Sequence, residues 1–273
     1  MTDPGLEQRV RAHFGEQGVR AIGGLPYPLE VGPYFRTEPD DDVPFGAYAE
    51  SVGAPLSRPE QAEWTRLGLD GGFELCVDAA GSVQAVTLIE DEPARFVNSG
   101  AAQLLSALLG LDRLLDAVSG ASNPERAAAA FQAFQAQLAE EDPAAVADGD
   151  HWWPQVLDDI RDTSSVSSYA AFEYLDDNGD KQIVTRSGGP CVHPEERLWE
   201  ALEAAGVEPG QITRVYTELQ TCSLPGHYCA LWTGRLFPRA EHTYSFPYGD
   251  TQASRREGIR SLLEAAAARE GQE

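Results

Sequence analysis

The fold of the C-terminal part of the chain is decided by two stretches, CVHPEERLWEAL (residues 191–202) and ITRVYTELQTCSLPGHYC (residues 212–229). Leucines recur with helical spacing in the first stretch, which predicts a helix over 194–205. Apolar and polar residues alternate at the start of the second, which predicts a strand over 212–219. A helix followed directly by a strand indicates that helices and strands alternate here.

The pattern continues on both sides of these stretches. The predicted elements are, in order, strands 169–175 and 181–187, helix 194–205, strand 212–219, helix 228–236, strand 240–246 and helix 253–269. Residues 162–168 are rich in Ser and Thr, and we expect a linker there. The alternation predicts an α/β domain over 162–273, a layered sheet with helices and with parallel pairings among its later strands.

A histidine, a glutamate and two cysteines lie where two of these helices begin: His193, Glu195, Cys222 and Cys229. One imidazole and two thiolates would leave the fourth tetrahedral position of Zn²⁺ open for water, as in catalytic zinc sites. Zinc lowers the pKa of that water toward neutrality, so that hydroxide can attack an electron-poor ring carbon. Glu195 would take the water's proton and deliver it to the ring nitrogen and then to the departing amine.

Together with AEHTYSFPYGD (residues 240–250), the two quoted stretches resemble the nucleic acid and nucleotide deaminases of bacterial polymorphic toxin systems. These enzymes belong to the cytidine-deaminase-like superfamily. The resemblance covers about residues 163–273. It implies a zinc cofactor held by the same histidine and cysteines, and cytosine as the base that is deaminated.

The sequence departs from the common deaminase signature in two ways. Thr221 stands where the signature has proline, and six residues rather than two separate Cys222 from Cys229. An inserted turn could absorb the extra residues while both sulfurs still face the metal. Because of the longer spacing, His227 and Cys191 remain alternatives to Cys229 as the third ligand.

The N-terminal part mixes strands with long helices. The predicted elements are helix 5–15, strands 73–78, 83–90 and 94–97, helices 101–118 and 124–141, and a short helix over 151–160. Residues 23–59 are rich in Gly and Pro, and we expect loops with short extended pieces there. This part is predicted to be an α+β domain over 1–161.

Two stretches of the N-terminal part, ARFVNSGAAQLLSALLGLDRLL (residues 94–115) and DPAAVADGDHWWPQVLDDI (residues 142–160), resemble the SUKH immunity-protein superfamily, in particular its fourth subfamily. The resemblance covers about residues 1–161. It implies an α+β domain that acts by binding, often to neutralise a toxin from a contact-dependent or secreted system. It implies no catalytic residues.

The chain has 273 residues and a net charge of −24. Residues 1–161 hold 27 acids and 10 bases, a net −17, whereas residues 162–273 hold 17 acids and 10 bases, a net −7. This acidity opposes non-specific coating of nucleic acid, although it allows the local capture of one base. An acidic N-terminal domain is suited to binding a basic toxin or another protein.

The sequence predicts a cytoplasmic protein without a membrane partner. Its first residues, MTDPG, have no basic region followed by an apolar run. The most apolar stretch, 101–118, contains Asp112, Arg113 and Asp116, which exclude it as a membrane span. In that compartment we expect reduced thiols, and clustered Cys and His residues then indicate a metal or catalytic site.

Basic and aromatic residues near the C-terminus are candidates for substrate contacts. The basic residues are Arg235, Arg239, Arg255, Arg256 and Arg260. They could meet phosphates, or they could pair with acidic neighbours such as Glu257 and Glu264. One of Tyr244, Phe246 and Tyr248 could stack on a base, or they could pack in the core.

These patterns favour a zinc-dependent hydrolytic deaminase that converts cytosine to uracil in nucleic acid, with single strands favoured, or in a nucleotide. A SUKH-like binding domain from a toxin–immunity system would be fused to it. The alternative is an immunity protein that neutralises a toxin, with a deaminase-like domain that is inactive or structural. A third possibility is a housekeeping deaminase for free nucleosides, which the mild acidity of residues 162–273 suits.

Overall fold

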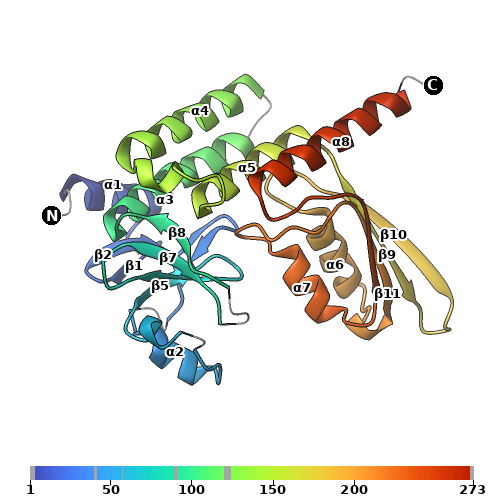
Figure 1. The fold of residues 1–273 in the computed structure, drawn as a ribbon, viewed down its shortest axis with the longest axis horizontal. Coiled ribbons are helices and arrows are strands. Elements are labelled where there is room, and N and C mark those ends of the chain that lie inside the picture. Colours follow the sequence, from blue (N-terminus) through green and yellow to red (C-terminus); the bar gives the residue numbers. More distant parts are fainter. Residues whose placement is uncertain (1–3, 40–41, 57, 89–91, 120–123, 271–273) are drawn as a thin grey trace. The chain divides into compact units, whose positions relative to one another are not determined.

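The structure is a computed structural model that describes residues 4–39, 42–56, 58–88, 92–119 and 124–270. It divides into two compact units, Met1–Val156 and Leu157–Glu273. Both units combine helices with a β-sheet (Figure 1). The predicted mixture of α+β and α/β architecture is therefore confirmed.

The first unit is built on a six-stranded sheet in which every neighbouring pair of strands is antiparallel. Its strands, in spatial order, are β3 (Glu30–Val31), β4 (Phe35–Arg36), β5 (Thr65–Leu69), β6 (Glu74–Val77), β7 (Val83–Val86) and β8 (Arg95–Asn98). A separate antiparallel ribbon pairs β1 (Val19–Ile22) with β2 (Leu25–Pro28). The predicted strand over 83–90 is thus shorter than expected, and residues 89–91 lie outside the described residues.

The three long helices predicted for the first unit are confirmed. They are α1 (Pro4–Phe14), α3 (Ala101–Ser119) and α4 (Pro124–Glu141). Nine residues of α3 are buried, and α3 and α4 lie side by side (Figure 1). The expectation of loops and short extended pieces over 23–59 missed α2 (Phe45–Ser51). That helix buries Phe45 and Ala49 and has no side-chain cap, so the sequence contains no capping residue from which its start could be predicted.

The second unit contains a four-stranded sheet with the strand order β10-β9-β11-β12. β9 (Tyr169–Leu175) pairs antiparallel with both β10 (Lys181–Ser187) and β11 (Ile212–Leu219), whereas β12 (Glu241–Phe246) pairs parallel with β11. The predicted hairpin and the predicted parallel pairing of the later strands are confirmed. The helices are α6 (Pro194–Ala204), α7 (Cys229–Leu236) and α8 (Gln252–Glu270).

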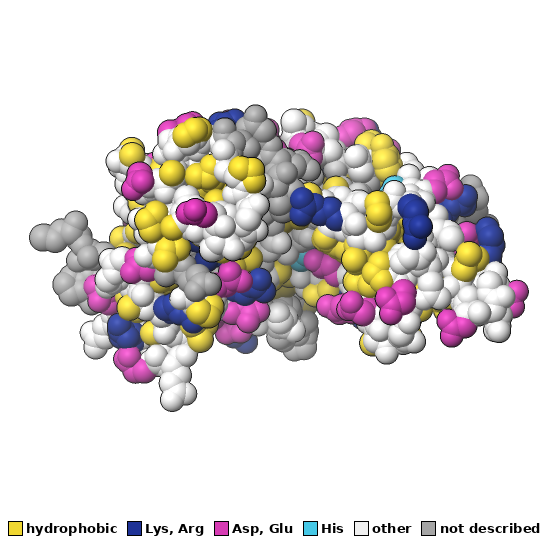
Figure 2. Space-filling view, turned by 90° about the horizontal axis from the view of Figure 1, so that it is seen from below, with side chains coloured by type: hydrophobic (Ala, Val, Ile, Leu, Met, Phe, Trp, Pro, Cys, Tyr) yellow, Lys and Arg dark blue, Asp and Glu magenta, His cyan; other side chains and the backbone are white. Residues whose placement is uncertain are grey.

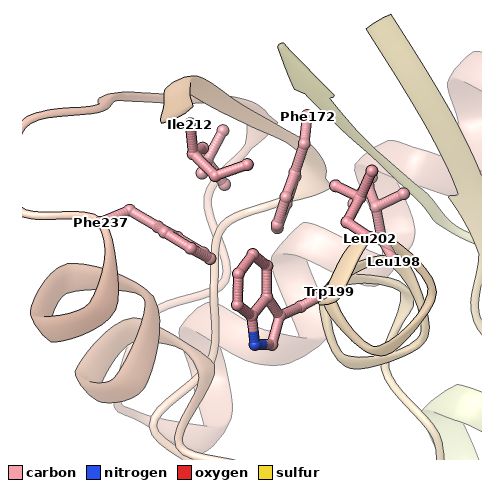
Figure 3. Packing of buried hydrophobic residues seen from close by; sticks show 8 residues of the cluster. Phe172, Leu198, Trp199, Leu202, Ile212 and Phe237 are labelled. Atoms are coloured by element: carbon pink, nitrogen blue, oxygen red, sulfur yellow. The ribbon is translucent and has the colours of Figure 1, made fainter. Parts of the chain in front are cut away.

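A hydrophobic core joins α6, the end of α7 and one face of this sheet. Trp199 lies against Phe237, with ring centroids 4.9 Å apart, and Phe237 in turn meets Phe172 of β9 at 5.5 Å (Figure 3). Leu198 and Leu202, the pair whose spacing predicts α6, are both buried in the same cluster. The core therefore fixes the N-terminal end of α6 relative to the end of β11, where the candidate site lies.

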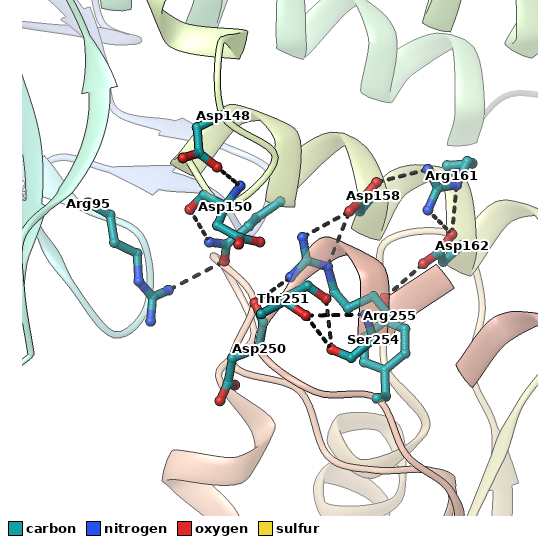
Figure 4. Close-up of polar contacts among 12 residues, drawn as sticks. Arg95, Asp148, Asp150, Asp158, Arg161, Asp162, Asp250, Thr251, Ser254 and Arg255 are labelled. Atoms are coloured by element: carbon teal, nitrogen blue, oxygen red, sulfur yellow. Dashed lines mark hydrogen bonds and ion pairs between the residues drawn. The ribbon is translucent and has the colours of Figure 1, made fainter. Parts of the chain in front are cut away.

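The linker predicted over 162–168 is wrong for its first four residues, because helix α5 runs from Trp152 to Ser165. Its C-terminal half is held within the second unit. The Asp158 carboxylate accepts two hydrogen bonds from Arg255 of α8, at 2.9 and 3.2 Å (Figure 4). Asp162 accepts one from the Tyr248 hydroxyl at 2.8 Å. These buried contacts stabilise a helical segment that its Ser/Thr-rich composition alone does not favour.

Candidate metal centre

Two helix starts and one loop bring a histidine and two cysteines together in the second unit. His193 is the N-cap of α6, Cys222 lies in the loop after β11, and Cys229 is the first residue of α7. Tyr228 takes a left-handed conformation with φ of 44°, and the N–H of Ala230 donates to the backbone oxygen of Cys222 at 2.9 Å. This turn absorbs the six residues between the cysteines and brings both thiols to one point.

The three side chains have the spacing that a tetrahedral ion needs. His193 Nδ1 lies 3.4 Å from Cys222 Sγ and 3.3 Å from Cys229 Sγ. Zn–S and Zn–N bonds at a tetrahedral angle place the sulfur and nitrogen about 3.6 Å apart. All three residues are buried, and their ligand atoms lie within 4.8 Å of one another. This group could hold a metal ion.

Glu195 lies in the first turn of α6, two residues after His193, and is 4% exposed. Its Oε2 has no hydrogen-bond partner among the described residues. Burial raises the pKa of Glu195 to about 7, although the charge of His193 opposes the shift. A buried carboxyl with one oxygen lacking a partner fits a site that receives a polar ligand such as water.

The two thiols differ in their readiness to ionise. Burial opposes ionisation of Cys222, but its hydrogen bond with Cys229 and the charge of His193 lower the pKa of Cys222 well below its usual value. Burial and the neighbouring Cys222 raise the pKa of Cys229. Cys222 therefore ionises more readily than Cys229, and metal binding requires both sulfurs in the thiolate form.

A carboxylate and a second histidine lie on the far side of the His193 ring. Asp159 of α5 places Oδ1 2.7 Å from His193 Nε2 and Oδ2 3.1 Å from His227 Nε2. His227 Nδ1 faces both carboxylate oxygens of Glu196, at 2.9 and 3.0 Å. Burial would raise the pKa of Asp159, but the two histidines outweigh it and hold that pKa well below its usual value.

The three candidates for the third ligand position have different surroundings in the structure. Cys229 lies with His193 and Cys222, whereas His227 belongs to a second possible group with Asp159 and His193. Cys191 is in neither group. Its backbone takes a left-handed φ of 53°, and its N–H donates to the side chain of Thr163.

Sequence reasoning missed Asp159 as a neighbour of this centre. Its position 34 residues before His193, in a stretch predicted to end another domain, gives no local motif. The one available signal is the pair Asp158-Asp159 near the end of an apolar helix, and such pairs are usually solvated.

A pocket opens beside the centre. It encloses about 540 Å³, including the part open to solvent, and its lining includes His193, Glu195, Cys222, Thr217, Gln220 and Tyr248. The part of it that water-sized groups can occupy is about 50 Å³, which is room for a few water molecules. The pocket gives a ligand access to the carboxyl of Glu195 and to one thiol.

The basic and aromatic candidates have different environments. Arg255 is buried against Asp158, and Arg260 pairs with Glu257 and Glu264, so these two arginines are engaged within the fold. The alternative of pairing with acidic neighbours is therefore confirmed for Arg260. Tyr248 is buried, and its hydroxyl donates to Asp162 at 2.8 Å. Tyr244 is half exposed and remains available to a ligand.

The fold and the centre define a two-part protein, with an α+β unit and a deaminase-like α/β unit. Residues 9–159 match the family model of the SUKH-4 immunity protein, and residues 165–265 match that of the Xanthomonas-like deaminase. Because the first match covers more than half of the chain, the protein belongs to the SUKH-4 immunity protein family. None of the curated proteins or solved structures compared with the chain matches it significantly.

Two surface properties bear on the possible partners. Among the described residues, no helix is both long and apolar enough to span a membrane. On the face shown in Figure 2, acidic side chains are scattered among basic and apolar ones. On this face the net charge is therefore distributed rather than concentrated in one acidic patch.

Proposed function

We propose that the second unit is a zinc-dependent hydrolytic deaminase of a nucleobase, with His193, Cys222 and Cys229 as zinc ligands and Glu195 as the proton carrier. The deaminase match over residues 165–265 supports the reaction class. The donor set supports zinc, because one imidazole and two thiolates form a ligand set that zinc prefers.

The observation that carries the proposal is the state of Glu195. Its carboxyl is buried and lines a pocket, and it has a hydrogen bond with its own backbone N–H, but Oε2 has no hydrogen-bond partner among the described residues. Buried polar atoms are normally hydrogen-bonded. An oxygen left without a partner beside a pocket is suited to a ligand that arrives later.

Zinc, when bound, supplies a Lewis acid that lowers the pKa of a coordinated water toward neutrality. Glu195, with a pKa of about 7, accepts a proton from water and returns it first to the ring nitrogen and then to the departing amine. The walls of the pocket restrict bulk water around the carboxyl, which keeps this pKa high.

The substrate proposed is cytosine, converted to uracil, in a nucleic acid or nucleotide. Zinc deaminases take a base that is unpaired or flipped out, which favours single strands. The preference for cytosine over adenine rests on the family resemblance alone, because cytosine and adenine deaminases use the same zinc ligands and the same glutamate.

The test is ammonia release by the zinc-loaded full chain from cytidine and from a single-stranded oligonucleotide that contains cytosine. Glu195→Gln keeps the size of the side chain but removes the proton carrier. We expect it to lower the turnover rate by about 10²- to 10⁴-fold, the usual contribution of general acid–base catalysis.

Glu200→Gln is the matched control, because Glu200 lies on the same helix α6 but is exposed. It is expected to leave the rate unchanged. Equal activity of the unchanged chain and of Glu195→Gln would contradict the assigned mechanism. A preference for cytidine over the oligonucleotide would identify a deaminase of free nucleosides.

A second candidate function is toxin neutralisation, which the SUKH-4 match over more than half of the chain favours. In this case the first unit binds a toxin of a polymorphic toxin system, and the deaminase-like unit is inactive or holds a structural zinc. A zinc-loaded chain that binds a toxin but releases no ammonia from either substrate would support this function over the first.

The division into an immunity-type domain over 1–161 and a deaminase-like domain over 162–273 is also part of the proposal. So is a cytoplasmic location, which would keep the thiols of Cys222 and Cys229 reduced and able to bind zinc. Oxidation of this pair would remove both sulfur ligands at once.

A further inference from the structure

The ring of His193 makes a contact through each of its two nitrogens. His193 Nδ1 faces the two cysteine sulfurs, at 3.3 and 3.4 Å, and Nε2 faces Asp159 Oδ1 at 2.7 Å. A carboxylate accepts and does not donate, so Nε2 carries the proton in this contact. The lone pair of neutral imidazole is then on Nδ1, where the ion would bind.

The Asp159 carboxylate is itself held in place. Its second oxygen meets His227 Nε2 at 3.1 Å, and His227 Nδ1 meets Glu196 at 2.9 Å. Glu196 also accepts the backbone N–H of His193 at 2.9 Å, which closes a ring of contacts. The His193 and His227 rings stack at 3.9 Å with an angle of 9° between their planes. Asp159 and His227 therefore restrict the rotation of the His193 ring.

Helix α5 presents Asp159 through a face that is packed within the second unit. Asp158 and Asp162, one turn apart, bond Arg255 and Tyr248. Thr163, one turn after Asp159, accepts the N–H of Cys191 at 2.9 Å. Four residues on one side of the helix thus fix its position beside the α6 N-terminus.

We propose that Asp159 is a positioning residue for the metal centre: it selects the tautomer of His193 and orients Nδ1 toward the ion. The inference rests on the proposed function, because it assumes that His193 is a ligand. Asp159 lies outside the deaminase match, which begins at residue 165, and it is the last position of the SUKH-4 match. The metal centre then depends on the helix that leads into the deaminase-like part.

The experiment measures the affinity of the full chain for zinc by competition with a chromophoric chelator. Loss of a carboxylate that orients a ligand histidine typically weakens metal binding by about 10- to 100-fold. We expect a loss in this range for Asp159→Ala and a smaller loss for Asp159→Asn, which keeps an acceptor oxygen.

Glu200→Gln is the matched control. Glu200 is an exposed carboxylate on α6, so its replacement removes a charge from the helix that His193 caps without altering α5 or the proposed ligands. We expect Glu200→Gln to bind zinc as tightly as the unchanged chain. Urea unfolding of each variant separates a general loss of stability from a specific loss of affinity.

The absorption spectrum of the cobalt(II)-substituted protein separates positioning from a purely structural role, because a purely structural role of Asp159 would leave the cobalt bands unchanged. The unchanged chain should show thiolate-to-cobalt absorption, and Asp159→Ala at saturating cobalt should show altered bands because the imidazole is turned. Folded Asp159 variants with unchanged zinc affinity and cobalt bands would overturn the positioning role and leave the deaminase proposal intact. An unchanged chain that binds neither metal, or binds cobalt without thiolate bands, would overturn both proposals.

Discussion

Three glutamates of α6 show how position alone gives one residue type different roles. Glu195 is buried, and its Oε2 has no hydrogen-bond partner among the described residues. Glu196 bonds the His227 ring and the His193 backbone, and Glu200 faces solvent. The first two lie in the first turn, where the helix dipole favours negative charge. Glu196 uses that position to hold the α6 start, which leaves Glu195 free to face the pocket.

The buried hydroxyl of Tyr27 is expected to make the first unit less stable at alkaline pH. Tyr27 is fully buried, and its hydroxyl donates to the backbone oxygen of Ala101 at 3.0 Å. Burial raises the pKa of Tyr27. The folded state therefore keeps a proton that the unfolded state loses above about pH 10, and stability is lost as the pH rises through that range.

We predict that Tyr27→Phe reduces this alkaline loss. At pH 8 the variant should unfold about 1 kcal/mol more easily, because one hydrogen bond is missing. Between pH 8 and pH 11, its free energy of unfolding in urea should fall less than that of the unchanged chain. Tyr244→Phe, which alters a half-exposed ring, is the control. An equal alkaline loss with and without the Tyr27 hydroxyl would contradict the prediction.

At the scale of elements, long apolar helices were the most predictable features and helix ends the least. The leucine run fixes α3 because a helix with nine buried residues is hydrophobic over most of its surface. The end of α5 was not predictable. Its residues from Asp162 to Ser165 resemble a linker in composition, and contacts with Tyr248 and Cys191, distant in sequence, keep them helical. α2 has the same explanation, since burial rather than a cap stabilises it.

Helix packing gives a paired prediction for two helical glycines. A Cβ at Gly110 of α3 would lie 2.9 Å from the Phe134 ring of α4, whereas a Cβ at Gly234 of α7 would meet nothing within 4 Å. Gly110→Ala should destabilise the protein by about 1–3 kcal/mol, the usual cost of overpacking. Gly234→Ala should stabilise it by up to about 1 kcal/mol through helix propensity. Urea unfolding measures both, and a stabilising Gly110→Ala would contradict the close packing of α3 and α4.

At the scale of the whole molecule, the two parts of the sequence carry different kinds of information. The N-terminal part has a family pattern and a net charge of −17, but no residue type or spacing in it identifies a partner. The C-terminal part has residue types whose chemistry is specific, so its candidate ligands could be named from spacing alone. The net charge of the whole chain said little about the candidate site, because most of that charge lies in residues 1–161, which contain none of the candidate metal ligands.

The candidate centre shows where spacing stops being informative. Histidine, glutamate and cysteine positions predicted the group His193, Cys222 and Cys229 that the fold brings together. Spacing left Cys229 and His227 as alternatives. In the structure, the turn at Tyr228 precedes Cys229, which lies beside His193, whereas His227 bonds two carboxylates. Asp159 could not be predicted, because its contact depends on how α5 packs in the second unit.

The proposed centre is best tested by measuring the zinc content of three full-length proteins: the unchanged chain, Cys229→Ser and His227→Ala. Each is equilibrated with excess zinc and freed of unbound metal. We expect one zinc ion per chain in the unchanged protein and in His227→Ala, and none in Cys229→Ser, which loses a thiolate ligand. Retention of zinc by Cys229→Ser together with its loss from His227→Ala would contradict the His193–Cys222–Cys229 centre.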